Sequence, residues 1–153
     1  MYSRSEAIQI KKEFWTRFGL YMKPVKNAAG HTTNWVNYKT GVRHIYFRMD
    51  AGKRAASVAI ELKHPQPEDR ESTYNKFVQL KTYLENVLQE TWDWEPLFYD
   101  EDGLPASRII QQLPDVNVFN QADWPAIISF LKDGIMKLDL FWTDVKPQFE
   151  GAI

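Results

Sequence analysis

Two stretches in the middle of the chain alternate between apolar and polar side chains. The apolar positions of residues 43–50 and 55–63 are Ile45, Phe47, Met49, Val58, Ile60 and Leu62. A period of two sends alternate side chains to opposite faces of a strand. The pattern therefore predicts two antiparallel strands joined by a turn at 51–54, with one face in the core and the other face polar.

The flanking segments predict further strands and three helices. Ser3 and Glu6 have the spacing of a capping box at the start of a helix over 5–22. Apolar residues three or four positions apart predict two more helices at 68–91 and 121–145. Strand-like patterns occur at 35–39, 92–99 and 108–112, and the last of these is also compatible with a helical turn.

These elements predict an α+β fold in a single domain spanning 1–153. The strands at 35–39, 43–50 and 55–63 are expected to form an antiparallel three-stranded meander, to which one or two further strands are added. The order is helix, three strands, helix, one or two strands, helix, which is reminiscent of the restriction-endonuclease-like core. A chain of 153 residues is long enough to bury a substantial apolar core.

The composition limits the classes of protein and of site. There is no cysteine, which excludes disulfides, thiolate metal sites and cysteine nucleophiles. The stretch from Met1 to Phe14 contains Lys11, Lys12 and Glu13 where a signal peptide would have an apolar run. No stretch is apolar enough for a membrane-spanning helix. We therefore expect a cytoplasmic protein with no membrane partner.

Charge is divided unevenly along the chain. Residues 1–63 hold 12 Lys and Arg against four Asp and Glu, whereas residues 64–153 hold seven against 16. Such asymmetry indicates an anionic partner on the basic half, or two halves that face each other within one fold or across a homodimer.

The polar face of the predicted strands is the candidate binding surface. It combines His44, Tyr46, Arg48, Glu61 and Lys63. Cations there can contact phosphate oxygens, and tyrosine can stack on unpaired bases. We expect a non-catalytic binding or interaction module whose basic sheet surface engages nucleic acid or an acidic protein, without a metal or cofactor.

An alternative is a Mg²⁺-dependent nuclease that uses Glu61 and Lys63, which form a Glu-x-Lys sequence, together with Asp50. In that chemistry carboxylates hold the metal ion and the lysine stabilises charge on the phosphate. The predicted strand register argues against this alternative, because it pairs His44 with Glu61. Asp50 then lies six residues further along the hairpin, roughly 20 Å from Glu61.

Several short motifs lie along the predicted elements. They are Phe14-Trp15, residues 34–41, residues 45–48, residues 60–62, Trp92-x-Trp94 and Asn120-x-x-Asp123-Trp124-Pro125. Together they resemble a bacterial family known as domain of unknown function 4268, over nearly the full length of the chain. The resemblance implies no activity, ligand or catalytic residue. Longer members look like fusions of this domain to a nuclease-like domain, which implies a DNA-associated accessory role.

Overall fold

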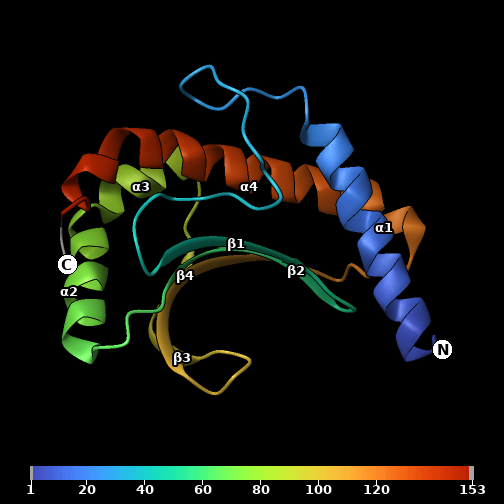
Figure 1. Ribbon diagram of the computed structural model, residues 1–153, viewed down its shortest axis with the longest axis horizontal. Coiled ribbons are helices and arrows are strands. Elements are labelled where there is room, and N and C mark those ends of the chain that lie inside the picture. The colour runs from blue at the N-terminus through green and yellow to red at the C-terminus, as the bar shows by residue number, and fades with distance from the viewer. Residues whose placement is uncertain (1, 152–153) are drawn as a thin grey trace.

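The structure is a computed structural model that describes residues 2–151, and its elements confirm an α+β fold (Figure 1). The elements in chain order are α1 (Arg4–Met22), β1 (Ile45–Ala51), β2 (Ala55–Leu62), α2 (Pro67–Gln79), α3 (Lys81–Leu88), β3 (Asp93–Tyr99), β4 (Pro105–Pro114) and α4 (Trp124–Val145). Short 3-10 turns at Gln121–Asp123 and Lys146–Gln148 flank α4. No helix in this part of the chain is long and apolar enough to cross a bilayer.

The four strands of residues 2–151 form one antiparallel sheet in the order β1-β2-β4-β3. The register of the β1–β2 hairpin differs by two residues from the predicted one. Tyr46, rather than His44, lies opposite Glu61. The shift follows from a turn centred one residue further along the chain than predicted, in which the Gly52 N–H donates to Ala55 O and Ala51 pairs with Ala56. A shift of two leaves every side chain on its predicted face.

The helix α4 lies along the convex, apolar face of the curved sheet (Figure 1). Apolar side chains of both layers are fully or almost fully buried there, among them Phe47, Val58, Ile60, Ile109, Ile127, Leu131 and Leu138. Burying one such side chain stabilises the fold by about 1.5–3 kcal/mol. The two layers approach each other closely at Gly134, where an added Cβ would lie 2.9 Å from Val58 Cγ2.

The predicted strand at 35–39 is wrong, because these residues form a loop, in the segment that crosses α4 (Figure 1). Its inward-facing side chains are Trp35 and Tyr38, which are three residues apart and therefore do not follow the period of a strand. Trp35 Nε1 donates to Val25 O, and the Tyr38 hydroxyl donates to Asp139 of α4. The three-stranded meander is therefore not present, and β4 takes the second side of β2.

The helix predicted at 68–91 is two helices, α2 and α3, separated at Leu80 by backbone angles outside the helical range. With this extra helix and the missing strand, the predicted order of the restriction-endonuclease-like core is not confirmed. Other expectations are confirmed. Ser3 and Glu6 form the capping box of α1, the segment at 92–99 corresponds to β3, and 108–112 lies within strand β4.

Candidate functional site

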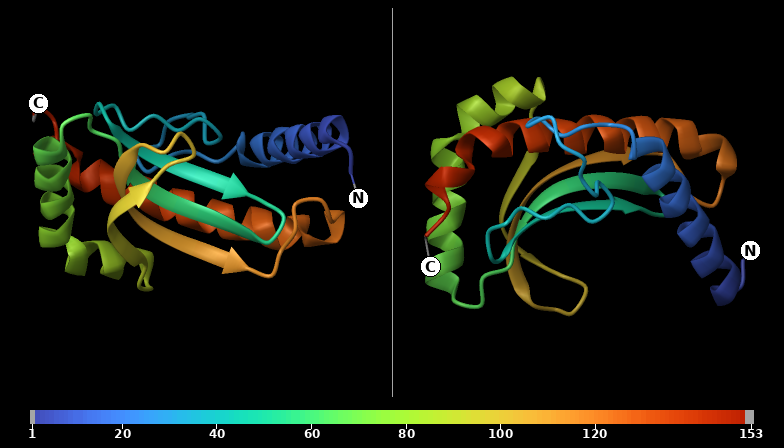
Figure 2. Two further views of the ribbon diagram at one scale, coloured as in Figure 1. Left: turned by 90° about the horizontal axis from the view of Figure 1, so that it is seen from below. Right: turned by 45° about the horizontal axis from the view of Figure 1, so that its top comes forward.

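The face of the sheet turned away from α4 is its concave face (Figure 1), and Figure 2 (left) shows the sheet from below with α4 behind the strands. The polar side chains of β1 lie on this face. The register places Tyr46 opposite Glu61 and Arg48 opposite Ala59 on this face. Tyr46 and Arg48 are exposed, whereas Glu61 is buried. The turn between β3 and β4 curls beneath the same face (Figure 1), so that it can supply side chains to it.

Glu61 is the centre of an ion-pair network that we call the concave-face cluster, formed by Arg48, Glu61, Lys63, Asp100 and Glu101. Arg48 Nε lies 3.2 Å and Lys63 Nζ lies 3.7 Å from Glu61 Oε1. Lys63 Nζ also lies 3.4 Å from Asp100 Oδ2, and Arg48 Nη2 lies 3.9 Å from Glu101 Oε1. The acidic half of the sequence thus neutralises cations of the basic half within the fold.

The carboxylate of Asp100 is held by its own turn. The backbone N–H groups of Leu104 and Asp102 each donate to Asp100 Oδ1 at 2.9 Å. The hydrogen bond from Leu104 is the main reason that the pKa of Asp100 is below its ordinary value, with further contributions from Asp102 and Lys63. Asp100 is therefore a fixed negative charge facing Lys63.

The concave face is more acidic than the sequence predicted. A hollow of about 240 Å³ beside the cluster has the charged lining residues Arg48, Asp50, Glu61, Asp100, Glu101 and Arg108. Arg108 Nε is in turn 3.0 Å from Glu95 Oε1. The acids outnumber the cations around this hollow, which does not favour the binding of phosphate groups.

His44, which was predicted on this face, lies outside it. It precedes β1 with a φ of 69°, and its ring centroid is 5.2 Å from that of His64. His64 is buried, and its Nε2 is 3.3 Å from the Thr73 hydroxyl. Burial, and next the nearby His44, hold the pKa of His64 below its ordinary value. The two histidines therefore form a pair near α2, separate from Arg48.

The residues of the predicted nuclease site are not brought together. Asp50 lies opposite Ser57, four residues along β2 from Glu61 and therefore about 13 Å away. The predicted separation of six residues was too large, but the new one still exceeds the reach of a single metal ion. Within residues 2–151, no three His, Asp or Glu side chains are grouped so that they could hold a metal ion. The geometry gives the nuclease alternative no support.

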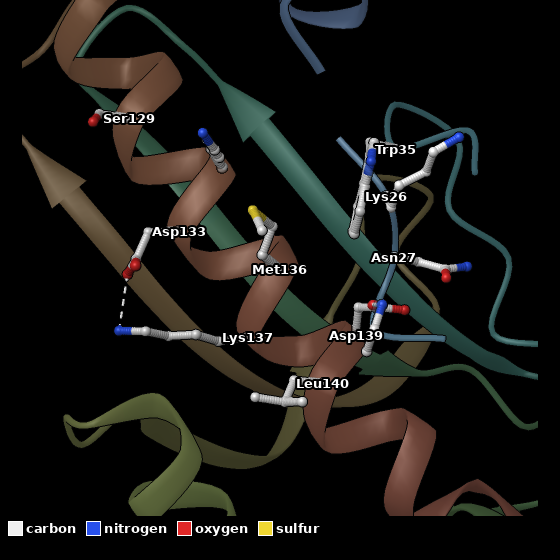
Figure 3. A pocket seen from close by; sticks show the side chains of 11 residues that line it. Lys26, Asn27, Trp35, Ser129, Asp133, Met136, Lys137, Asp139 and Leu140 are labelled. Atoms are coloured by element: carbon white, nitrogen blue, oxygen red, sulfur yellow. Dashed lines mark hydrogen bonds and ion pairs between the residues drawn. The ribbon is translucent and has the colours of Figure 1, made fainter. Parts of the chain in front are cut away.

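A larger cavity, of about 590 Å³, lies between α4 and the loop that follows α1. We call it the α4 groove, and its lining residues are Lys26, Asn27, Ala28, Trp35, Ser129, Lys132, Asp133, Met136, Lys137, Asp139 and Leu140. Figure 3 shows Met136 projecting from α4 toward the side on which Trp35 and Lys26 lie. Its volume is within the range of ligand-binding pockets.

One wall of the α4 groove is fixed by Asp139. This carboxylate is buried on α4 and accepts hydrogen bonds from the Ala28 N–H at 2.7 Å and the Tyr38 hydroxyl at 2.6 Å. Burial and the hydrogen bond to Asp139 strongly raise the pKa of Tyr38, so its hydroxyl stays protonated and continues to donate. The loop is therefore anchored to α4, and the groove is preformed.

The polar rim of the α4 groove carries three lysines. Lys137 Nζ is 3.1 Å from Asp133 and donates to Leu88 O, so its charge is compensated. Lys26 Nζ has only the Thr32 hydroxyl as a hydrogen-bond partner in the described chain, and Lys132 Nζ lies 5.2 Å from the centroid of the Tyr21 ring. Asp139 keeps its negative charge, because its two donors are neutral, so the lining has three lysines against two acids and keeps an excess of one positive charge.

Exposed apolar side chains continue the α4 groove at its edges. Leu140 lines it with 51% of its surface exposed, and Tyr21, beneath Lys132, is 52% exposed. Val36 is also exposed and lies in the same loop as Trp35. Large exposed apolar groups that gather around one cavity mark interaction sites more often than scattered ones do.

Sequence reasoning did not find the α4 groove. The sequence contains one signal that could have indicated it, since residues 14–49 hold six Lys and Arg and not a single Asp or Glu. A second signal is Asp139, an acid within the apolar pattern of the last helix. The groove itself depends on how the loop crosses α4, which the strand predicted at 35–39 concealed.

Comparison with known proteins identifies a family. The family model described as a domain of unknown function (DUF4268) matches residues 10–146. This match covers most of the chain, so the chain belongs to this family. No curated protein and no solved structure matches it.

Proposed function

Since membership of this family assigns no activity, we propose from the geometry that the domain is a non-catalytic interaction module that docks an acidic segment of a partner protein in the α4 groove. The observation that carries the proposal is the combination of an apolar floor with lysines that have no ion-pair partner in the described chain, around a cavity of about 590 Å³. The concave sheet face, where the sequence predicted binding, is a weaker candidate because its cations already have acidic partners.

The floor of the α4 groove suits apolar side chains of a partner. Trp35 and Met136 line it, with the exposed Leu140 at its edge, and methionine adapts to differently shaped side chains because its thioether chain is flexible. Protein interfaces have apolar centres enriched in aromatic residues and methionine, with polar groups at the rim. The groove has this arrangement on a small scale.

The rim determines the charge of the partner. Lys26 and Lys132 carry positive charge that no acid of the described chain neutralises within 4 Å. Carboxylates on the partner would complete these pairs, increasing the rate of association and fixing the orientation more than they increase affinity. A single apolar floor between two cations fits a segment with apolar side chains flanked by Asp or Glu.

The proposal is tested by titrating the isotope-labelled protein with a synthetic acidic amphipathic peptide that carries leucines on one face and glutamates elsewhere. We expect saturable shifts of the backbone amide resonances of residues 26–28 and 129–140. The affinity should fall as salt rises, because exposed charge pairs are screened. A matched peptide with lysine in place of glutamate should bind at least tenfold more weakly.

Substitutions of charged residues test whether the acidic peptide binds in the α4 groove. The double change Lys26→Glu and Lys132→Glu should weaken binding of the acidic peptide at least fivefold, whereas Lys53→Glu, on the exposed hairpin turn, should leave it unchanged. Equal binding of the two peptides, or shifts confined to the concave face, would contradict the proposal. Displacement of the peptide by a single-stranded oligonucleotide, or self-association of the protein through these residues, would also overturn it by identifying a different occupant.

A further inference from the structure

Arg70 is a buried arginine with no acidic partner. It lies on α2 with only 6% of its surface exposed, and none of the ion pairs among residues 2–151 includes it. Arginine keeps its charge in proteins, and a buried charge without a partner is costly. The buried charge of Arg70 therefore lowers the stability of the fold, which indicates that this charge serves to bind something.

One edge of the Arg70 guanidinium makes a hydrogen bond within the protein. Its Nε donates to the Ser107 hydroxyl at 3.2 Å, and this hydroxyl donates to Pro96 O at 2.7 Å. The chain of hydrogen bonds fixes the guanidinium against the β3–β4 ladder. It leaves the two terminal amino groups of the arginine available.

These amino groups face an opening. In the described chain, the enclosed side-chain nitrogen or oxygen atoms without a partner are His64 Nδ1 and Trp94 Nε1. The Arg70 amino groups are not among them although they make no hydrogen bond to a described residue, so they are not fully enclosed. Arg70 lines a cavity of about 340 Å³ between α2 and the β3–β4 ladder, which we call the Arg70 pocket, together with Glu71, Tyr74, Asn75, Pro96, Leu97 and Ser107.

Two further donors line the Arg70 pocket. The Tyr74 hydroxyl and the Asn75 side-chain amide make no hydrogen bond to another described residue. Burial, and next the charge of Glu95, raise the pKa of Tyr74, so its hydroxyl keeps its proton at neutral pH and can donate. A fixed guanidinium edge, a hydroxyl and an amide thus belong to residues that line the same cavity.

The geometry points to the Arg70 pocket as a binding site for a small organic carboxylate. A planar guanidinium edge pairs with a carboxylate through two parallel hydrogen bonds. Pro96, Leu97 and the Tyr74 ring offer apolar surface to the rest of the ligand. Glu71 at the same pocket favours a single negative charge over the higher charge of phosphate. The site is separate from the α4 groove and does not depend on it.

Benzoate is a suitable probe, because it combines a carboxylate with an apolar ring, and benzamide is its neutral counterpart. We expect benzoate to shift the Arg70 Nε–H resonance and the amides of residues 70–75 and 96–97 in a saturable way, with a Kd on the order of 1 mM for so small a ligand. Benzamide and inorganic phosphate should bind at least tenfold more weakly.

Substitutions test the role of the guanidinium. Arg70→Met, which keeps the length of the side chain, should abolish benzoate binding, and Arg70→Lys should weaken it about tenfold because the two-pronged contact is lost. Arg54→Met, at the exposed hairpin turn, is the matched control and should bind benzoate as the unmodified protein does.

Removing Arg70 affects a buried side chain, so two gentler variants keep the test decisive if Arg70→Met does not fold. Tyr74→Phe and Asn75→Ala each delete one donor, and each should weaken benzoate binding about two- to fivefold with an unchanged fold. Equal binding of benzoate and benzamide, or unchanged benzoate binding in both variants, would overturn the proposal. Tighter binding of phosphate than of benzoate would overturn the assignment to carboxylates.

Discussion

The two faces of the sheet share the same four strands but are stabilised by different interactions. The convex face packs apolar side chains against α4, with Gly134 allowing the helix to approach Val58 closely. The concave face joins Arg48, Glu61 and Lys63 to a turn about 40 residues further along the chain through ion pairs with partly exposed cations. Apolar contacts depend on shape and ion pairs on charge and solvent, so the two faces should respond to different changes.

The largest effect is expected on the convex face. Gly134→Leu should lower the free energy of unfolding by about 3 kcal/mol, because even a Cβ at this position comes within 2.9 Å of Val58 Cγ2. Urea denaturation would measure the change. Ala126→Leu, at an exposed position of the same helix, should change stability by about 0.5 kcal/mol or less. Equal losses in the two variants would show that α4 is not closely packed at Gly134.

A smaller effect is expected from the concave-face cluster. Glu61→Gln should lower the free energy of unfolding by about 1–2 kcal/mol, since Glu61 is buried against charged donors whereas Arg48 is half-exposed and screened by solvent. Asp50→Asn on the same face should cost less than about 0.5 kcal/mol, because Asp50 has no ion pair within the described chain. Adding salt should reduce the difference between the two variants. A difference independent of salt would argue that Glu61 acts through packing.

The smallest effect concerns acid pH. Because the folded state holds the pKa of Asp100 below its ordinary value of 3.8, its stabilising contribution is present above that value and is lost as the pH falls through the folded pKa. The stabilities of the unmodified protein and Asp100→Asn should therefore converge in strong acid. An NMR titration of the Asp100 carboxyl should have its midpoint below 3.8, and Lys63→Met should raise this midpoint. A midpoint at or above the ordinary value would contradict the turn geometry.

Several elements could be predicted because their signals are local. The alternation around Phe47 and Ile60 determined which face of β1 and β2 is buried, and a capping box determined the start of α1. The exact register of β1 on β2 could not be predicted, because two registers that differ by two residues both place apolar side chains of β1 opposite apolar side chains of β2. The hydrogen bond of Gly52 to Ala55 decided between the alternatives.

The candidate sites were less predictable than the fold, since each depends on residues far apart in the sequence. The polar face was predicted from Arg48, Glu61 and Lys63, and the structure does bring these residues together. The acids that neutralise them belong to a distant turn. No spacing in the sequence indicates that Asp100 reaches Lys63, so around the hollow of a surface expected to be basic the acids outnumber the cations.

By itself the sequence determined the α+β class, the two faces of the central hairpin and the family, because periodicity and short motifs are properties of neighbouring residues. Only the tertiary structure decided that residues 35–39 cross α4 as a loop, that Asp139 anchors this loop and that Arg70 lines a cavity without an ion-pair partner in the described chain. Whether a charge is paired or available depends on which segments meet in space. Which segments lie next to each other is determined by the packing of the whole core, and not by the residues beside the charge in the sequence.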